Sequence, residues 1–159
     1  MTARAFLLCL AALVPAFSLS APGQAQERPV PYWASLRHDR ARMRVGPGED
    51  YQLAWVYQRK GLPVKVVRIM QGWRLVQDPD GTRGWVQAIS LTPEREAFVR
   101  GQEAEMRENP DGTGRLMWRA AHGVVGKLGD CSGAGWCRFD VGGRNAWVKA
   151  DDLWGTGTP

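Results

Sequence analysis

Residues 42–51 read RMRVGPGEDY, and residues 105–114 of the same 159-residue chain read EMRENPDGTG. Each stretch contains Met-Arg, and each has a proline four residues after the methionine. Met43 and Met106 are 63 positions apart, and the two prolines keep the same spacing. A motif shared at a fixed offset indicates that one small structural unit occurs twice.

The repeat extends beyond this opening pair. QGWRLV matches AGWCRF and places Trp73 against Trp136, again at an offset of 63. RGWVQAISL matches NAWVKADDL and places Trp85 against Trp147, at an offset of 62. These landmarks follow one order and differ by a single-residue gap, so the sequence predicts a tandem duplication.

The duplication predicts the domain organisation. The repeated units are residues 35–92 and 104–154. An N-terminal segment (26–34), a linker (93–103) and a C-terminal tail (155–159) flank them.

Short strands separated by tight turns are expected within each unit. PVKVVRIM is apolar and rich in β-branched residues, GWRLVQD follows at once, and DPDG (78–81) has the composition of a turn. Four or five such strands in a unit of about 55 residues are typical of a small β-barrel. The predicted fold class is therefore all-β.

The linker gives two conflicting signals. Thr92 followed by Pro93 is a good helix start, and acidic residues come next. REAFV has equally the composition of a short strand, and Gly101 would interrupt a long helix. A helix and a strand both remain open on local evidence.

The first 25 residues have the features of a secretory signal peptide. Arg4 is followed by an apolar run from Ala5 to about Phe17, and a small-residue stretch ends at Ala25. An uncleaved anchor is the alternative. Cleavage would leave a secreted, periplasmic chain of about 134 residues that starts near Gln26 and has no further apolar span.

Two cysteines remain after such a cleavage, in CSGAGWC. In an oxidising compartment Cys131 and Cys137 are expected to form a disulfide across the glycine-rich loop. A redox-active pair is the alternative, although the two-residue spacing of C-x-x-C motifs is absent.

Charge and composition argue against several function classes. The net charge of +5 becomes +4 without Arg4 and is spread along the chain, which is poor evidence for nucleic-acid binding. His38 and His122 are the only histidines, and no serine lies in a nucleophile motif. The histidines and the cysteine pair lack zinc-site spacing. We therefore expect no metal, no cofactor and no catalysis.

Two tryptophans occupy matching outward positions. Cys137, Phe139 and Val141 alternate as a core face, so Trp136 points to the other face of its strand. Trp73 does the same in the first unit. Either the fold covers these rings, or they form an aromatic floor for a ligand groove.

The segment LRHDRARMRVGPGEDYQLAWVYQRKGLPVKVV, with GWRLVQDPDGTRGWV, closely resembles the bacterial SH3-like domains of secreted proteobacterial proteins. The second half, with CSGAGWCRF and WVKADDLWG, resembles the second unit of a two-domain periplasmic family. The resemblance implies two tandem SH3-like five-stranded β-barrels, and a short strand after the first barrel favours the strand interpretation of REAFV. The acidic TPERE linker and the loop RENPDGTG depart from the family pattern.

This resemblance implies a binding module rather than an enzyme, because several bacterial SH3-like units are associated with cell-wall peptides. The groove candidates are aromatic residues and one arginine at matching places: Tyr51, Trp55, Tyr57, Trp73, Arg74, Trp118 and Trp136. Tyr51 has Gly114 as its counterpart, so the first unit is the better candidate for binding through this loop.

Two hypotheses follow for the partner. The protein binds peptidoglycan or its stem peptides, or it is a scaffold or accessory subunit that contacts another envelope protein. Nucleic acid is not expected as a partner, and the sequence does not indicate an oligomeric state.

Overall fold

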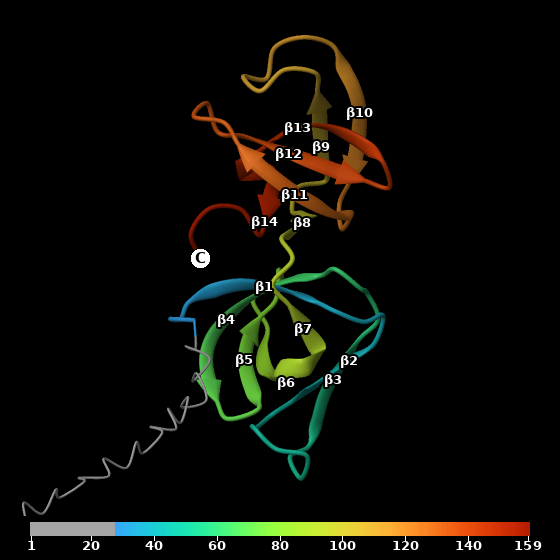
Figure 1. Ribbon diagram of the computed structural model, residues 1–159. Coiled ribbons are helices and arrows are strands. Elements are labelled where there is room, and N and C mark those ends of the chain that lie inside the picture. The colour runs from blue at the N-terminus through green and yellow to red at the C-terminus, as the bar shows by residue number, and fades with distance from the viewer. Residues whose placement is uncertain (1–27) are drawn as a thin grey trace, which may run out of the picture.

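The computed structural model describes residues 28–159, so the predicted signal peptide lies outside the described residues. Fourteen strands and two three-residue 3-10 helices make up the regular structure of this part of the chain. They form two antiparallel sheets of seven strands each, one in each half of the chain. Figure 1 shows the two units lying end to end.

The first sheet contains β1 (Tyr32–Leu36), β2 (Ala41–Arg44), β3 (Leu53–Tyr57), β4 (Pro63–Met70), β5 (Trp73–Gln77), β6 (Arg83–Gln87) and β7 (Leu91–Thr92). The second contains β8 (Glu96–Val99), β9 (Glu103–Arg107), β10 (Leu116–Ala121), β11 (Val125–Cys131), β12 (Trp136–Val141), β13 (Arg144–Lys149) and β14 (Leu153–Trp154). The 3-10 helices, Ala88–Ser90 and Ala150–Asp152, precede β7 and β14.

Both sheets have the same topology. The strand order is β3-β2-β6-β5-β4-β1-β7 in the first and β10-β9-β13-β12-β11-β8-β14 in the second. Each strand of the second sheet is thus the counterpart of the strand seven places earlier. The register agrees as well, because Met43 lies opposite Trp55 and Met106 lies opposite Trp118. The duplication and the all-β class predicted from the sequence are confirmed.

Each unit has seven strands where five were predicted. The additional strands are one at the start of each unit and a two-residue strand at its end. β1 starts at Tyr32, inside the predicted N-terminal segment, and pairs with β4. β8 is the strand alternative for REAFV, and it pairs with β11 and β14 of the second sheet. The segment predicted as a linker therefore supplies a strand of the second unit.

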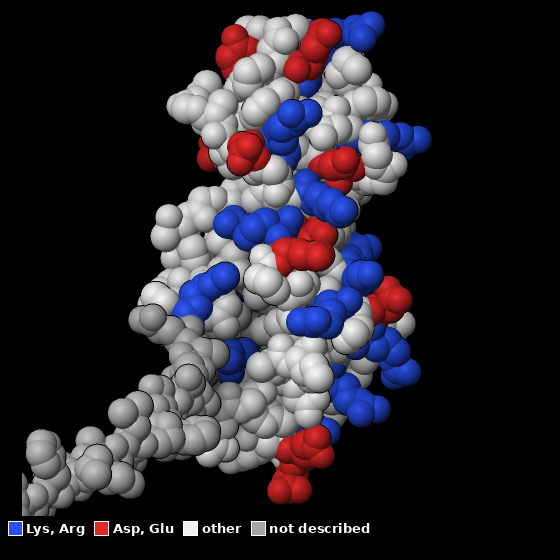
Figure 2. All heavy atoms as spheres, viewed as in Figure 1, with Lys and Arg blue, Asp and Glu red and all other residues white. Residues whose placement is uncertain are grey.

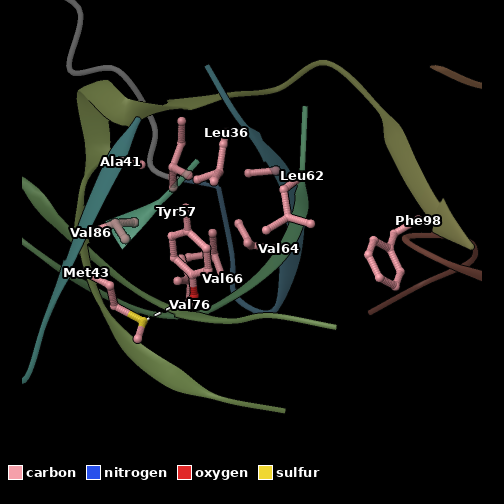
Figure 3. Packing of buried hydrophobic residues seen from close by; sticks show 12 residues of the cluster. Leu36, Ala41, Met43, Tyr57, Leu62, Val64, Val66, Val76, Val86 and Phe98 are labelled. Carbon is pink, nitrogen blue, oxygen red and sulfur yellow. Dashed lines mark hydrogen bonds between the residues drawn. The ribbon is translucent and has the colours of Figure 1, made fainter. Parts of the chain in front are cut away.

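Two hydrophobic cores fill the units. In the first, Val64, Val66, Val76 and Val86 are fully buried (Figure 3). These β-branched side chains alternate along β4, β5 and β6 and so share one face of the sheet.

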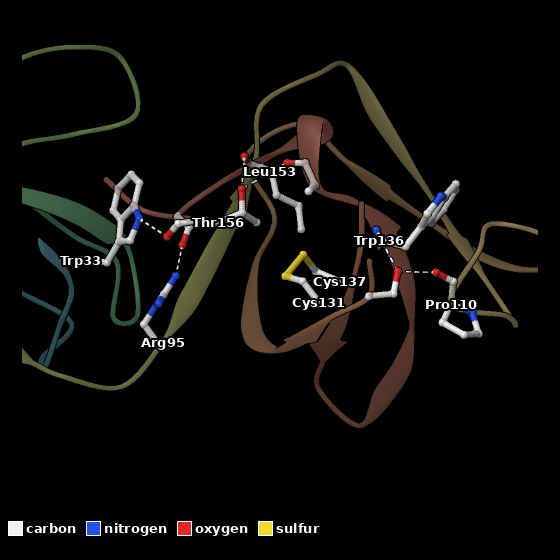
Figure 4. Close-up of a disulfide and its surroundings, with 12 residues drawn as sticks. Trp33, Arg95, Pro110, Cys131, Trp136, Cys137, Leu153 and Thr156 are labelled. Carbon is white, nitrogen blue, oxygen red and sulfur yellow. Dashed lines mark hydrogen bonds between the residues drawn. A yellow bond between two sulfur atoms is a disulfide. The ribbon is translucent and has the colours of Figure 1, made fainter. Parts of the chain in front are cut away.

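The second core is built around β12. Cys137 and Phe139 are fully buried, and Val141 packs against the same cluster, as the alternation in the sequence predicts. Cys137 also forms the predicted disulfide with Cys131, which joins β12 to the end of β11 (Figure 4). The bond therefore ties together the two strands of one hairpin in the second unit.

The two units are packed against each other. Phe98 lies on β8 of the second sheet, but its side chain belongs to the core of the first unit. The ring of Trp33 on β1 meets the ring of Trp154 on β14 edge to face, with their centroids 5.0 Å apart. The ammonium group of Lys65 lies 5.7 Å from the first ring centroid and 5.4 Å from the second. A cation is attracted to the face of an aromatic ring, so these two contacts are favourable.

Hydrogen bonds also tie the predicted C-terminal tail to this junction. Trp33 Nε1 donates to the carbonyl of Gly157 at 3.1 Å, and Arg95 Nη2 donates to the carbonyl of Gly155 at 2.6 Å (Figure 4). The tail therefore lies against the first unit. Within residues 28–159, no helix has the length and apolar character that a membrane crossing needs.

Candidate binding site

A pocket of about 390 Å³ opens in the first unit, between the edge strand β3 and the turn that joins β5 to β6. Its walls are mostly apolar and aromatic, and its charged groups are Asp78 and Asp80 of the turn and Arg83 at the start of β6. The residues that matter for its chemistry are Trp55, Tyr57, Leu62, Asp78, Asp80 and Phe98.

Trp55 is the exposed wall of the pocket. It lies opposite Met43 in the β2–β3 register, so both side chains are on the core-facing side of the sheet. The strand β3 ends the sheet, and the indole remains 60% exposed. A large aromatic side chain kept this accessible beside an apolar pocket is well placed to stack on a ligand.

Tyr57 forms the floor of the pocket and is buried. Its hydroxyl donates to the carboxylate of Asp78 at 3.1 Å. The same hydroxyl lies 3.2 Å from Met43 Sδ, a contact that Figure 3 marks with a dashed line. Burial raises the pKa of Tyr57 well above its usual value, and the negative charge of Asp78 raises this pKa further. The hydroxyl therefore stays protonated and acts as a fixed donor.

Asp78 organises the turn beside the pocket. One carboxylate oxygen accepts the hydroxyl of Tyr57, and the other accepts the backbone N–H groups of Asp80 and Thr82 at 3.1 and 2.9 Å. An aspartate that bonds backbone groups two and four residues later stabilises a turn of this kind. The predicted DPDG turn is present, and it holds the Asp80 carboxylate at the rim of the pocket.

The pocket is completed from the second unit. Phe98 and Leu62 line one side of it, and both are buried. Because Phe98 comes from β8, the shape of the pocket depends on how the two units are packed. The whole site therefore offers an exposed indole, an apolar base and carboxylates, which suits the binding of a small peptide or sugar unit.

The predicted groove residues do not all meet in this pocket. Trp55 and Tyr57 line it. Tyr51 is exposed and lies over Gly46 and Gly48 in the loop after β2. These three aromatic residues were predicted as one group, but only two of them share a cavity.

Trp73 and Arg74 lie elsewhere in the first unit. Trp73 is half-buried at the start of β5. Arg74 lines a separate small pocket, and its Nε donates to the hydroxyl of Tyr32 at 3.2 Å. Neither residue lines the Trp55 pocket.

The second unit differs at the matching positions. Trp118, the counterpart of Trp55, is half-buried and packs against the second core. Ala120 stands where the first unit has Tyr57, so the hydroxyl that bonds Asp78 has no counterpart there. Trp136 is half-buried, and its ring lies so close to Gly112 that no side chain would fit at that glycine.

Sequence reasoning missed four of the residues that matter for the pocket, namely Leu62, Asp78, Asp80 and Phe98. Asp78 and Asp80 were interpreted only as part of the DPDG turn, and Leu62 directly precedes the predicted strand PVKVVRIM. Phe98 lies 43 residues after Trp55, in the other unit. The repeat offset held one clue, since Leu36 and Val99 are also 63 positions apart and mark β8 as the counterpart of β1.

Removing the Tyr57 hydroxyl is expected to destabilise the protein by about 1–2 kcal/mol at neutral pH, because Tyr57→Phe leaves a buried carboxylate oxygen of Asp78 without its donor. Above about pH 10 the difference should shrink. The unfolded chain loses the tyrosine proton near its ordinary pKa while the folded chain keeps it, so the stability of the wild type falls with rising pH.

Urea unfolding at neutral pH and above pH 10 measures both effects. Tyr51→Phe is the matched control, because it removes a hydroxyl from an exposed ring of the same unit. A parallel fall of stability in the wild type and in Tyr57→Phe would contradict the assignment.

No curated protein matches the chain. Solved structures that resemble it include NlpC2 from Trichomonas vaginalis, with 12% identity, 80% of this chain and 49% of that chain covered, and a TM-score of 0.36. NlpC1 from the same organism has 13% identity, 87% and 50% coverage, and a TM-score of 0.35. This chain spans about half the length of those proteins.

The family comparison is more specific. The sequence model described as bacterial SH3 domain matches residues 37–92 and again residues 100–155. Each match falls on one of the two sheets and covers the motifs from which the resemblance was drawn. The two matches together account for most of the chain, and the protein therefore belongs to the bacterial SH3 domain family, with two copies of the domain in tandem.

Proposed function

We propose that the protein is a non-enzymatic binding module of the cell envelope that recognises peptidoglycan or its stem peptides. The observation that carries this proposal is the Trp55 pocket, where an exposed indole stands beside an apolar base and carboxylates. A stem peptide offers small apolar side chains for the base and amino groups for Asp80, so each part of the pocket has a matching group.

The compartment is part of the proposal. Bacterial SH3 domains and a disulfide are consistent with a protein outside the cytoplasm. We place the chain in the periplasm, where it would meet the cell wall, with each sheet closed as an SH3-like barrel.

The non-enzymatic character rests on the environment of the histidines. The ring of His122 packs edge to face on Phe98, with centroids 5.5 Å apart, and its Nδ1 contacts the backbone carbonyls of Arg100 and Gly101. His122 is thus engaged in the junction between the units. His38 is exposed before β2 and does not line the Trp55 pocket.

Retention on purified sacculi, followed by calorimetry with a soluble stem peptide, tests the proposal. Trp55→Ala is expected to weaken binding about tenfold or more, as is usual for a central aromatic anchor. Ile89→Ala is the matched control, because Ile89 is 74% exposed and lies outside the pocket. Tyr51→Ala shows whether the ligand binds to the loop after β2 instead of the pocket.

The outcomes discriminate clearly. Binding that survives Trp55→Ala but is lost in Tyr51→Ala would move the site to the loop after β2. Absence of retention of the wild type at low salt, compared with a control protein, would refute wall binding altogether.

An envelope protein as partner is the second candidate, and a specific feature favours it. The strand β3 ends its sheet and exposes Leu53 and Trp55. An edge strand with apolar side chains can pair with an extended segment of another protein. Affinity capture from envelope extracts would then recover one stoichiometric protein whose binding is lost with a proline at Ala54.

A further inference from the structure

A second pocket of the first unit has a different chemistry from the Trp55 site. It has a volume of about 370 Å³ and lies on the outer face of β2. Its lining is mostly polar, and the groups that matter are Arg40, Arg42, Arg44, Glu49, Gln87 and Ser90.

The three arginines follow the alternation of the strand. Ala41 and Met43 are buried in the core, so the residues between and beside them point outward. Alternate residues of a strand are roughly 7 Å apart, which gives a row of positive charge roughly 14 Å long. Figure 2 shows a column of Lys and Arg side chains along one side of the first unit.

Most of this charge is uncompensated. Within residues 28–159, the guanidinium groups of Arg40 and Arg42 have no hydrogen bond or ion pair. Arg44 uses one N–H, which donates to the carbonyl of Tyr51 at 2.6 Å. Glu49 is the single carboxylate of the pocket, and it accepts a hydrogen bond from Gln87 at 2.9 Å.

The second unit shows that the fold does not require these arginines. At the positions 63 residues later, Glu103 and Glu105 replace Arg40 and Arg42, and Arg107 matches Arg44. The carboxylate of Glu103 lies 3.4 Å from Arg119 Nε, and that of Glu105 lies 2.6 Å from Arg107 Nη2. The same strand face is therefore neutralised internally in one unit and left positive in the other.

We propose that the arginine pocket of β2 binds the phosphate groups of a flexible anionic polymer. Guanidinium groups bind phosphate oxygens with two parallel hydrogen bonds, and a phosphate accepts from several directions at once. The hydroxyl of Ser90, which also lines the pocket, is an additional donor for such an acceptor-rich ligand. A row of separate charges suits a polymer better than a single ion, because each arginine can meet a different phosphate.

The arginine pocket is separate from the Trp55 pocket, so this proposal does not depend on the proposed function. Trp55 and the arginines line different pockets, and no residue is shared between them. Trp55→Ala should therefore leave phosphate binding unchanged, and loss of the arginines should leave stem-peptide binding unchanged. The failure of one proposal is distinguishable from the failure of the other.

Binding of a short linear polyphosphate to the full chain, measured by fluorescence anisotropy, tests the inference. Arg40→Gln with Arg42→Gln is expected to weaken binding at least about tenfold and to make its salt dependence shallower, since fewer counterions are released. Arg115→Gln with Arg144→Gln is the control with the same charge change, on two exposed arginines of the second unit. Its binding should stay within about twofold of the wild type.

Four results would overturn the proposal. They are an equal loss in the control pair, equal affinity for a poly-glutamate of matched charge, tighter binding of duplex DNA, and absence of wild-type binding at low salt. Thermal unfolding of both double variants shows that any loss does not come from unfolding.

Discussion

Phe98→Ala is expected to lower the free energy of unfolding by about 3–4 kcal/mol, because truncating a buried phenylalanine removes its apolar contacts and leaves a cavity. The effect should extend to both units. The backbone of Phe98 pairs with Val125 and Trp154 in the second sheet, while its ring packs in the first core. Urea unfolding followed by tryptophan fluorescence measures the loss.

Amide hydrogen exchange shows which of the two units loses stability. In Phe98→Ala, amides of β1 and β4 should exchange faster, although the mutated residue lies outside their sheet. Phe139→Ala is the matched control, because Phe139 is fully buried within the second core. Unchanged protection of the first unit in Phe98→Ala would show that the ring does not support that core.

The second large effect concerns the disulfide. Replacing both Cys131 and Cys137 by alanine is expected to lower stability by about 2 kcal/mol, since the bond closes a short loop and constrains the unfolded chain only modestly. Folding should persist, because β11 and β12 remain paired and Phe139 with the other members of the second core stays in place.

Thermal unfolding with and without a reducing agent checks this result. Reduction should lower the melting temperature of the wild type and leave that of the double alanine variant unchanged. A variant as stable as the oxidised wild type would show that the bond adds nothing to stability.

The repeat determined how much of the fold could be predicted. Landmarks at a nearly constant offset imply equal topology, and the two sheets have it. The strand in REAFV was predicted, but neither β1 nor β8 was recognised as the first strand of its unit. Trp33 and Ser35 in β1 correspond to Glu96 and Phe98 in β8, and these pairs share no chemical character. Only the small and apolar positions keep their character, with Ala34 matched by Ala97 and Leu36 by Val99.

The binding site was predicted less completely, because aromatic residues alone do not show which of them meet. Trp55 and Tyr57 are close in sequence and share a pocket. Trp136 packs on Gly112, and Phe98 packs in the core of the other unit. Both are contacts between distant segments, and strand periodicity carries no information about them. Tertiary packing thus decides which candidates remain accessible.

The position of Phe98 couples the packing of the two units to ligand binding in the Trp55 pocket. The ring contributes to the first core and to the wall of the pocket at the same time. Any ligand that contacts this ring binds the closed arrangement of the two units better than an opened one. The coupling is reciprocal. The free energy that the packed junction adds to ligand binding equals the free energy that the bound ligand adds to the stability of the junction. Force or mutation that separates the units would then release the ligand.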